Sequence, residues 1–425
     1  MLVGLRTHRS LDRGRGNGQC RHHAHSSQEA PQRISDRQLS RASMSEGEEQ
    51  RRVALVSSSY HPHLGGVEEH VRQVAAELTS RGHTVEVWTV DRGERLGAQW
   101  VDGVRVRYLP TPLPARKTSN LARFALTAPL ALARWLRAAR QLRPDVIHVH
   151  CFGPNGPYAR VVASLTRTPW VLSAHGETFM DANDLFGRSA LMRAQLRRGC
   201  SDADAVTGCS EAVADDLRGA YGARDVSVVP NGVRVATHTT ITSPADATLK
   251  QVVAVGRLVE VKGFDLLIDA VARSREVRSL HVVGDGPERE ALQRLVRRLD
   301  LQDRVALLGP RSPEDAQQAM ANAALVVMPS RREAFGIVAL EAWASGTPLI
   351  ATSLGGPAGF VTDGVDGILV DPQDARALAN AMDQVLSSPS LAARLSTNGL
   401  ESVKRFTWDR VVDDYEAIYR SVDRP

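Results

Sequence analysis

Short apolar segments alternate with amphipathic helical segments along most of this chain, and the alternation occurs in two series. The first series begins with residues 52–56 and the second with residues 251–255, after a polar break at residues 237–250. Strands that alternate with helices in this way form parallel sheets whose two faces are covered by helices. We therefore expect an α/β protein with two doubly wound, Rossmann-like domains that face each other across a cleft.

The expected domain boundaries follow from where the two series begin and end. The chain of 425 residues is long enough for two or three domains. We expect a disordered basic extension at 1–49, an N-terminal domain at 50–236, a linker at 237–250, a C-terminal domain at 251–404 and a final helix at 405–425.

The positive charge of the chain is confined to its N-terminal extension. The formal net charge is +5, and residues 1–43 contain eight arginines against three acidic residues. The remaining residues are therefore close to neutral, which argues against a nucleic-acid-binding groove in the folded region. The extension has no long apolar core of the secretory type, and we expect Met44 to be the natural start of the protein.

The cysteines and the apolar segments bear on the cellular location. Cys20, Cys151, Cys200 and Cys209 show no CxxC spacing, so we expect free thiols in the reducing cytoplasm and no metal site. No window of about 18 apolar residues is present, so no membrane-spanning helix is expected. Residues 121–142 form an amphipathic basic helix, which either covers the protein surface or contacts the anionic inner face of a membrane.

Residues 330–341 place two carboxylates on either side of an expected helix N-terminus. Glu333 follows a strand and a polar turn, and Glu341 lies inside the helix at 337–344. The free N–H groups at a helix start attract an anion such as a phosphate. The two glutamates can then accept hydrogen bonds from hydroxyls on either side of that phosphate, as a nucleotide-sugar presents them. The alternative is that both glutamates are solvated surface residues.

The spacing of these glutamates disfavours a glycoside hydrolase. Retaining hydrolases hold two carboxyl groups about 5–5.5 Å apart. Eight residues of helix would separate Glu333 and Glu341 by roughly 12 Å. The pair is better suited to hold two parts of one extended ligand.

Loops after other strands supply positive charge and glycine. Arg257 and Lys262 lie in a turn bracketed by two glycines, where they either bind one diphosphate or are solvated cations. The sequence Gly284-Asp285-Gly286-Pro287 is either a plain turn or a contact near a nucleobase. A dinucleotide-binding signature is excluded because Arg289 occupies the place of its third glycine.

Two further features lie in the first half of the chain. Gly65 and Gly66 separate a strand from a helix, so their amides can approach a diphosphate. His175 ends a strand, where it is either a structural residue or a hydrogen-bond partner of a sugar hydroxyl or a leaving-group oxygen. We assign His148 and His150 to packing and to a strand end.

Together these motifs resemble glycosyltransferase family 4, the nucleotide-sugar-dependent retaining transferases with the GT-B fold. The resemblance covers about residues 50–420. The motifs that carry it are Glu333…Glu341 within Pro329-Ser330-x-x-Glu333-Ala334-Phe335-Gly336, Ala344-Ser345-Gly346-Thr347-Pro348, Gly256-Arg257-Leu258…Lys262-Gly263, Gly284-Asp285-Gly286-Pro287, Val229-Pro230-Asn231-Gly232-Val233 and Gly65-Gly66-Val67-Glu68.

The resemblance implies a role for each of these positions. The donor nucleotide-sugar, a UDP- or GDP-sugar, binds to 251–404, while 50–236 is the acceptor side and 405–425 crosses back to it. Glu341 holds the ribose, and Glu333 holds the transferred hexose. The implied catalytic residues are His175, Glu333, Arg257 and Lys262. The implied donor-binding residues are Gly65, Gly66, Arg257, Lys262, Glu333, Phe335, Gly336 and Glu341, with Gly284, Gly286 and Gly309 near the nucleobase. No metal or cofactor is implied, and the acceptor is a sugar, a lipid or a small molecule.

The chain departs from the family pattern at two places. Arg234 stands where many members have Asp, and Pro357-Ala358-Gly359 stands where many have a residue followed by Pro-Glu. We expect the loop after Gly356 to hold its ligand differently.

Three other classes of protein compete with this interpretation. A nucleotide-sugar epimerase or hydrolase on the same fold would bind the donor in the same way. A non-catalytic nucleotide-sugar-binding protein is disfavoured because Glu333, Glu341, Arg257 and Lys262 are all present. A nicotinamide-dependent dehydrogenase is disfavoured by the failed glycine signature.

Overall fold

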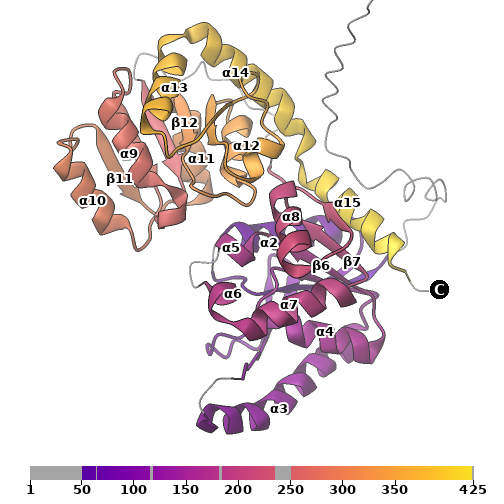
Figure 1. The fold of residues 1–425 in the computed structure, drawn as a ribbon. Coiled ribbons are helices and arrows are strands. Elements are labelled where there is room, and N and C mark those ends of the chain that lie inside the picture. The colour runs from indigo at the N-terminus through magenta and orange to yellow at the C-terminus, as the bar shows by residue number, and fades with distance from the viewer. Residues whose placement is uncertain (1–49, 64, 115–117, 181–183, 235–249, 424–425) are drawn as a thin grey trace, which may run out of the picture. The chain divides into compact units, whose positions relative to one another are not determined.

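The computed structural model describes residues 50–63, 65–114, 118–180, 184–234 and 250–423 (Figure 1). The expected N-terminal extension at 1–49 lies outside these residues, as does nearly all of the expected linker at 237–250. Each half of the described chain contains one large sheet.

The first half forms an eight-stranded sheet with the order β3-β4-β2-β1-β5-β6-β7-β8. All neighbouring strands are parallel except β3, which is antiparallel to β4 and was not predicted from the sequence. The strands are β1 (Arg52–Ser57), β2 (Thr84–Val90), β3 (Ala98–Val101), β4 (Val104–Leu109), β5 (Val146–His150), β6 (Trp170–Ala174), β7 (Ala205–Gly208) and β8 (Val226–Val228).

Helices cover both faces of this sheet because successive strand residues point to opposite faces. Leu55 packs with α2 and α15, whereas its neighbour Val56 belongs to the apolar cluster that contains α3, α4, α7 and α8. The helices are α2 (Gly66–Ser80), α3 (Thr118–Leu142), α4 (Asn155–Thr166), α5 (Glu177–Met180), α6 (Leu185–Arg188), α7 (Ala190–Asp202), α8 (Glu211–Tyr221) and α15 (Trp408–Ser421).

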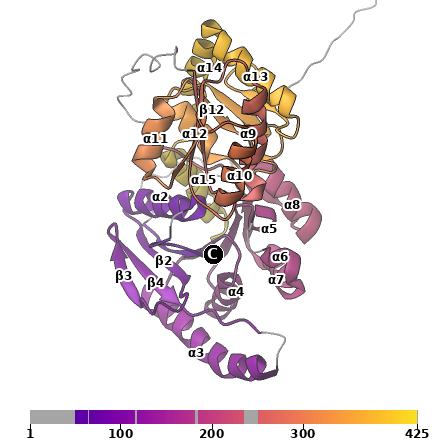
Figure 2. The ribbon, with the colours of Figure 1, turned by 90° about the vertical axis from the view of Figure 1, so that its left-hand side faces the viewer.

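The second half forms a six-stranded, fully parallel sheet with the order β11-β10-β9-β12-β13-β14. Figure 2 shows α11 and α9 on opposite sides of β12, in agreement with their membership of two different apolar clusters. The strands are β9 (Gln251–Val255), β10 (Ser279–Val283), β11 (Val305–Gly309), β12 (Leu325–Met328), β13 (Leu349–Thr352) and β14 (Ile368–Val370). The helices are α9 (Phe264–Arg273), α10 (Arg289–Arg298), α11 (Pro313–Ala321), α12 (Ile337–Ala344), α13 (Ala375–Ser387) and α14 (Pro389–Ser402), with the short 3-10 helices η2 (Glu260–Lys262), η3 (Gly356–Gly359) and η4 (Val403–Arg405).

Both predicted doubly wound sheets are thus confirmed, and each has one point at which the strand order reverses. In the first sheet this point lies between β1 and β5, and in the second it lies between β9 and β12. Open α/β sheets bind ligands beside the carboxyl ends of the strands at such a point. The loops after these four strands are therefore the expected position of a site.

The last helix, α15, packs against α2 of the first half, although it follows the second sheet in sequence (Figure 1). Tyr415 and Tyr419 are completely buried in the apolar cluster of that sheet. Arg81, at the end of α2, forms ion pairs with Asp413 at 2.6 Å and with Glu416 at 3.0 Å. Among the described residues, no helix is both long enough and apolar enough to cross a bilayer.

Glycine permits the loops after β9, β10 and β12 to touch through their backbones. Gly263 has a φ of +66°, and a Cβ added to it would lie 2.1 Å from the carbonyl oxygen of Pro329. Gly284 has a φ of +140°, and its added Cβ would lie 1.9 Å from the carbonyl oxygen of Gly256. Any side chain at either position would separate the loops.

We predict that Gly263→Ala destabilises the protein by about 1–3 kcal/mol, because it combines a left-handed backbone with a contact to Pro329. Gly219→Ala is the matched control, since an added Cβ in this helical position meets no atom within 4 Å. The control is expected to stabilise the protein by about 0.5–1 kcal/mol. Urea unfolding of both variants provides the measurement, and equal stabilities would contradict the prediction.

Candidate functional site

An ion pair joins the loops that follow β9 and β12. Lys262 Nζ donates to Glu333 Oε2 at 2.6 Å, and Ser330 Oγ donates to the same oxygen at 2.9 Å. The side chain of Glu333 is only 6% exposed, and a buried carboxylate requires such compensation. Within the described residues both bonds reach Oε2, so Oε1 is left to accept from a hydroxyl-bearing ligand.

Arg257 lies at the start of the same turn as Lys262. Its side chain is exposed, and no ion pair joins it to another of the described residues. The turn therefore offers one cation that is already paired with Glu333 and one that can meet an anion from solution.

The backbone of Glu333 is fixed by the loop after β13. Glu333 and Gly355 form an isolated parallel bridge, in which Glu333 N–H donates to Leu354 at 3.1 Å and its carbonyl accepts from Gly356 at 2.9 Å. Residues 357–359, where the chain departs from the family pattern, continue as η3. The backbone bonds on both sides of Glu333 therefore hold it against the loop after β13.

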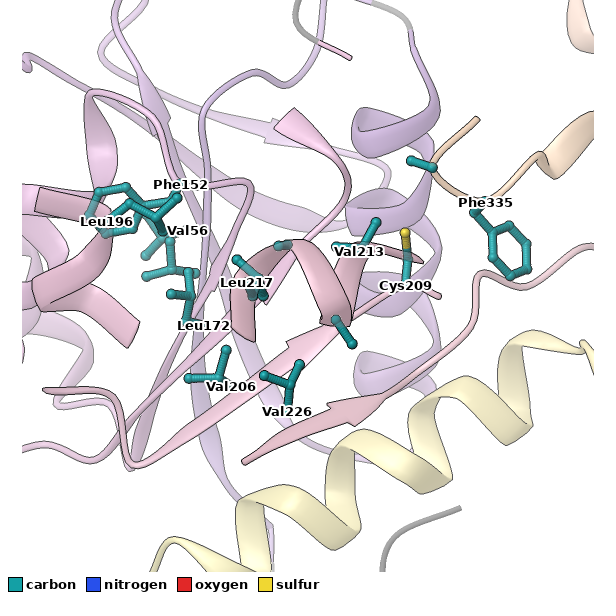
Figure 3. Packing of buried hydrophobic residues seen from close by; sticks show 14 of the residues in the cluster. Val56, Phe152, Leu172, Leu196, Val206, Cys209, Val213, Leu217, Val226 and Phe335 are labelled. Carbon is teal, nitrogen blue, oxygen red and sulfur yellow. The ribbon is translucent and has the colours of Figure 1, made fainter. Parts of the chain in front are cut away.

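Helix α12 begins directly after Gly336, at the predicted anion seat. Gly336 has a φ of +97°, and the next residue, Ile337, is the first of the helix. Phe335 is 4% exposed, and its ring stacks on Phe360 with 4.9 Å between centroids. Figure 3 shows the Phe335 ring on the same side as Val213 and Cys209 of the first half, and all three side chains belong to one buried apolar cluster. Only its backbone is available to a ligand.

Three loops of the first half lie against the loop that contains Glu333 and the start of α12. A Cβ added to Gly66 would lie 3.4 Å from Ile337 Cδ1, and one added to Gly176 would lie 2.4 Å from Ala334 Cβ. Ser210 Oγ also donates to the carbonyl of Ala334 at 2.5 Å. The loops after β1, β6 and β7 therefore all lie beside the predicted anion seat, and Gly65 in the first of them has an extended backbone.

His175 is held at its ring and at its backbone. Its Nε2 lies 3.2 Å from His150 Nδ1, and its backbone N–H donates to Glu177 Oε2 at 2.7 Å. The other oxygen of Glu177 accepts from the N–H of Phe152, also at 2.7 Å. Burial raises the pKa of Glu177, and burial holds the pKa of His175 well below its usual value. His175 is therefore a neutral imidazole in this site.

Glu341 lies on α12 beside α2 of the first half. Burial, and then the carboxylate of Glu69, raise its pKa to about 7. The neighbouring carboxylate that contributes to this shift is Glu69. Glu341 changes its charge near neutral pH, a property that the spacing in the sequence does not reveal.

The three glycines assigned to the nucleobase region lie at adjacent strand ends. Gly284 N–H donates to the carbonyl of Gly309 at 2.9 Å. A Cβ added to Gly286 would lie 2.4 Å from the carbonyl oxygen of Leu258. The ends of β10 and β11 thus present glycine backbone beside the turn that contains Arg257, and the guanidinium of Arg289 also lies next to Gly309.

Sequence reasoning missed several residues of the site. His70, Glu177, Ser210 and Tyr415 were not singled out. His148 and His150 are buried and His150 ends β5, as assigned, but the bond of His150 to His175 was not predicted. Glu177 directly follows His175-Gly176, which is a weak signal. His70 lies among the apolar residues of α2, and only its contacts across the fold show its role.

Known protein families match both halves of this chain. The model of the family Glycosyl transferases group 1 matches residues 241–402, and that of Glycosyltransferase Family 4 matches residues 64–237. The chain is 31% identical over 419 residues to D-inositol 3-phosphate glycosyltransferase of Acidothermus cellulolyticus. The aligned region covers 87% of this chain and 90% of that protein.

Solved structures show the same fold. Sucrose-phosphate synthase from Thermosynechococcus elongatus is similar with a TM-score of 0.71 and 26% identity, over 87% of this chain and 98% of that chain. Anabaena HepE in complex with UDP-glucose is similar with a TM-score of 0.66 and 23% identity, over 87% and 99% of the two chains.

We predict that Glu341→Gln raises the melting temperature more at pH 8 than at pH 4.5. The ordinary pKa of the group is 4.5 and its folded-state pKa is about 7, so the native state of the wild type loses stability as the pH rises through this window. The difference in melting temperature between the variant and the wild type should increase up to about pH 7 and stay constant above that pH. Glu290→Gln, at an exposed position, is the control, and a pH-independent difference for Glu341→Gln would contradict the prediction.

Proposed function

The chain belongs to the group 1/family 4 glycosyltransferases, and we propose that it moves a hexosyl group from a nucleotide-diphosphate sugar to an acceptor hydroxyl, with retention of configuration and without a metal ion. The observation that carries this proposal is the position of Lys262, Glu333 and the N-terminus of α12 at the point where the second sheet reverses its strand order. A lysine ammonium, a carboxylate that can accept hydrogen bonds from sugar hydroxyls, and the free amides of a helix start lie together at this point.

The diphosphate of the donor is bound by positive charge and by backbone amides. Arg257 supplies an exposed guanidinium, and Lys262 supplies an ammonium next to Glu333. The amides that begin α12 and the Gly65-Gly66 backbone add donors without side chains. Charge that develops on the departing diphosphate is stabilised by groups already in place, which is the most effective form of electrostatic catalysis.

The two glutamates hold hydroxyls on either side of that diphosphate. Oε1 of Glu333 accepts from the transferred sugar while Oε2 keeps its bonds to Lys262 and Ser330. Glu341 accepts from the ribose, and its elevated pKa makes the ionised form, in which both oxygens accept, dominant only above about pH 7. The nucleobase lies against the backbone of Gly284, Gly286 and Gly309.

Retention is supported by the absence of a suitable nucleophile among the described residues of this site. Glu333 is paired with Lys262 in the loop before α12, and Glu341 lies inside α12, four residues after the helix begins at Ile337. Attack of the acceptor on the same face as the departing diphosphate is therefore favoured over a covalent intermediate. His175, which is neutral, forms a hydrogen bond to the sugar or to the leaving oxygen.

The test begins with thermal-shift screening of UDP- and GDP-sugars, followed by transfer assays with sugar, lipid and small-molecule acceptors. NMR of the product is expected to show the donor's anomeric configuration, and EDTA is expected to leave the rate unchanged. An inverted product contradicts retention, and a rate that is lost in EDTA and restored by Mg²⁺ contradicts metal independence. Turnover without an acceptor indicates an epimerase or hydrolase, and donor binding without any turnover indicates a binding protein.

We predict that Lys262→Ala and Glu333→Gln each reduce transfer about 100-fold or more, because each removes a group that contacts the donor in the transition state. Lys404→Ala is the matched control, since Lys404 is 64% exposed and pairs only with Glu401 in the described chain. Circular dichroism confirms that each variant folds. Near-normal turnover in both site variants would refute the site.

The exposed part of α3 is suited to contact a second partner, an anionic membrane surface. Trp135, Ala138 and Ala139 fix the C-terminal half of the helix in the core. Leu126 and Leu130, nearer its start, are 75% and 68% exposed. The exposed basic residues of the helix are Arg123, Arg134, Arg137 and Arg140. We propose that these leucines enter the interface while the arginines meet anionic headgroups.

We predict that Leu126→Asn combined with Leu130→Asn abolishes co-sedimentation with phosphatidylglycerol-containing vesicles, since it removes the apolar contact. Leu165→Asn is the matched control, because Leu165 of α4 is 61% exposed outside α3. Phosphatidylcholine vesicles test the role of charge. Failure of the wild-type protein to bind anionic vesicles at low salt would refute the membrane contact.

A further inference from the structure

Four histidines lie side by side where α2 packs on β5 and β6, and the proposed function uses only one of them. They are His70, His148, His150 and His175, with ring centroids 4.6 Å apart for His70 and His175 and 3.9 Å apart for His148 and His150. Burial lowers the pKa of His70 to about 4 and keeps the pKa values of the other three well below the usual range. All four are neutral, so hydrogen bonds decide which ring nitrogen of each carries the proton.

Neither His70 nor His148 has a ring nitrogen that is available for a hydrogen bond to His175. Both nitrogens of each ring already have a hydrogen-bond partner. The partners of His70 are Asn231 Oδ1 at 2.7 Å and Tyr415 Oη at 3.0 Å, and those of His148 are Tyr419 Oη at 2.7 Å and Ser173 Oγ at 2.6 Å.

His150 is different because only one of its nitrogens is bonded. Its Nδ1 lies 3.2 Å from His175 Nε2, while its Nε2 is buried and has no hydrogen-bond partner among the described residues. A proton on Nε2 would therefore be a buried N–H without an acceptor, which folded proteins avoid. The proton of His150 belongs on Nδ1, from which it is donated to His175 Nε2. His175 must then carry its own proton on Nδ1.

We infer that His150 is a positioning residue that keeps His175 in the Nδ1–H form, so that His175 donates a hydrogen bond to an oxygen of the transferred sugar or of the departing diphosphate. The inference rests on the proposed function of His175. Glu177 supports the arrangement, because its two oxygens accept from the backbones of Phe152 and His175 and so join the ends of β5 and β6. The spacing of the two rings is thereby set by the backbone.

A metal ion shared by these histidines is the competing interpretation. Candidate ligand atoms of His70, His150 and His175 lie within 4.8 Å of one another. A metal would need a free lone pair from each ring, but both nitrogens of His70 are engaged by Asn231 and Tyr415. The hydrogen-bonded arrangement is therefore favoured.

Long-range ¹H–¹⁵N NMR of histidine-labelled protein reads the tautomers directly, and the His175→Ala variant assigns the signal. We expect His175 to be the Nδ1–H tautomer in the wild type and in His150→Asn, whose side-chain amide donates from the position of Nδ1. In His150→Phe the donor is lost, and His175 should shift towards the Nε2–H form. The kcat of His150→Phe should fall about tenfold or more while the Kd for UDP is unchanged, and His150→Asn should recover most of the activity.

His148→Asn is the matched control, since it removes a buried imidazole from the same strand but one without a bond to His175. It is expected to lower the melting temperature and leave the His175 tautomer unchanged. An Nε2–H form of His175 in the wild type, an unchanged tautomer in His150→Phe, or stoichiometric bound metal would each overturn the inference. If His150→Phe does not fold, the wild-type spectrum still decides. Normal transfer by His175→Ala would overturn the proposed role of His175 in the reaction. The tautomers that the spectra report do not depend on that role.

Discussion

Backbone contact between the loops at the carboxyl ends of the second sheet is the constraint on which the site depends. Parallel strands bring all these loops to one edge, and they can meet only where no side chain intervenes. The absent Cβ atoms of Gly263 and Gly355 would each lie 2.1 Å from a carbonyl oxygen of the facing loop. This contact places Lys262 2.6 Å from Glu333. The paired charges and the start of α12 thereby lie together, where we propose that the donor binds.

The first half of the site depends in the same way on an element distant in sequence. Helix α15 contributes Tyr415 and Tyr419, whose hydroxyls bond His70 and His148. Because both nitrogens of His70 and His148 have other partners, the hydrogen bond between two of the four histidines is the one that joins His150 and His175. The C-terminal segment therefore completes the histidine cluster of the N-terminal domain, and loss of its packing would release groups near His175.

Elements with strong local signals were predictable, and those without them were not. The apolar run of β12 and the Ala-rich helix α12 appeared in the structure as expected. Strand β3 was missed because its residues are largely exposed at a sheet edge and show little apolar alternation. The positions of Glu333 and Lys262 on neighbouring loops followed from the order of strands, but their direct ion pair did not. His150 ends β5 as assigned from the sequence, but its hydrogen bond to the ring of His175 was not predicted.

The sequence by itself determined the order of strands and helices, the glycines that leave the loop backbones bare and the kinds of chemical group available at each loop. These properties are local, because they depend on apolar periodicity and on the presence or absence of a side chain. Only the tertiary structure decided that Glu341 has a pKa of about 7 and that His175 is neutral with one nitrogen already bonded. Protonation depends on desolvation and on neighbours such as Glu69 and His150, which folding brings from distant parts of the chain.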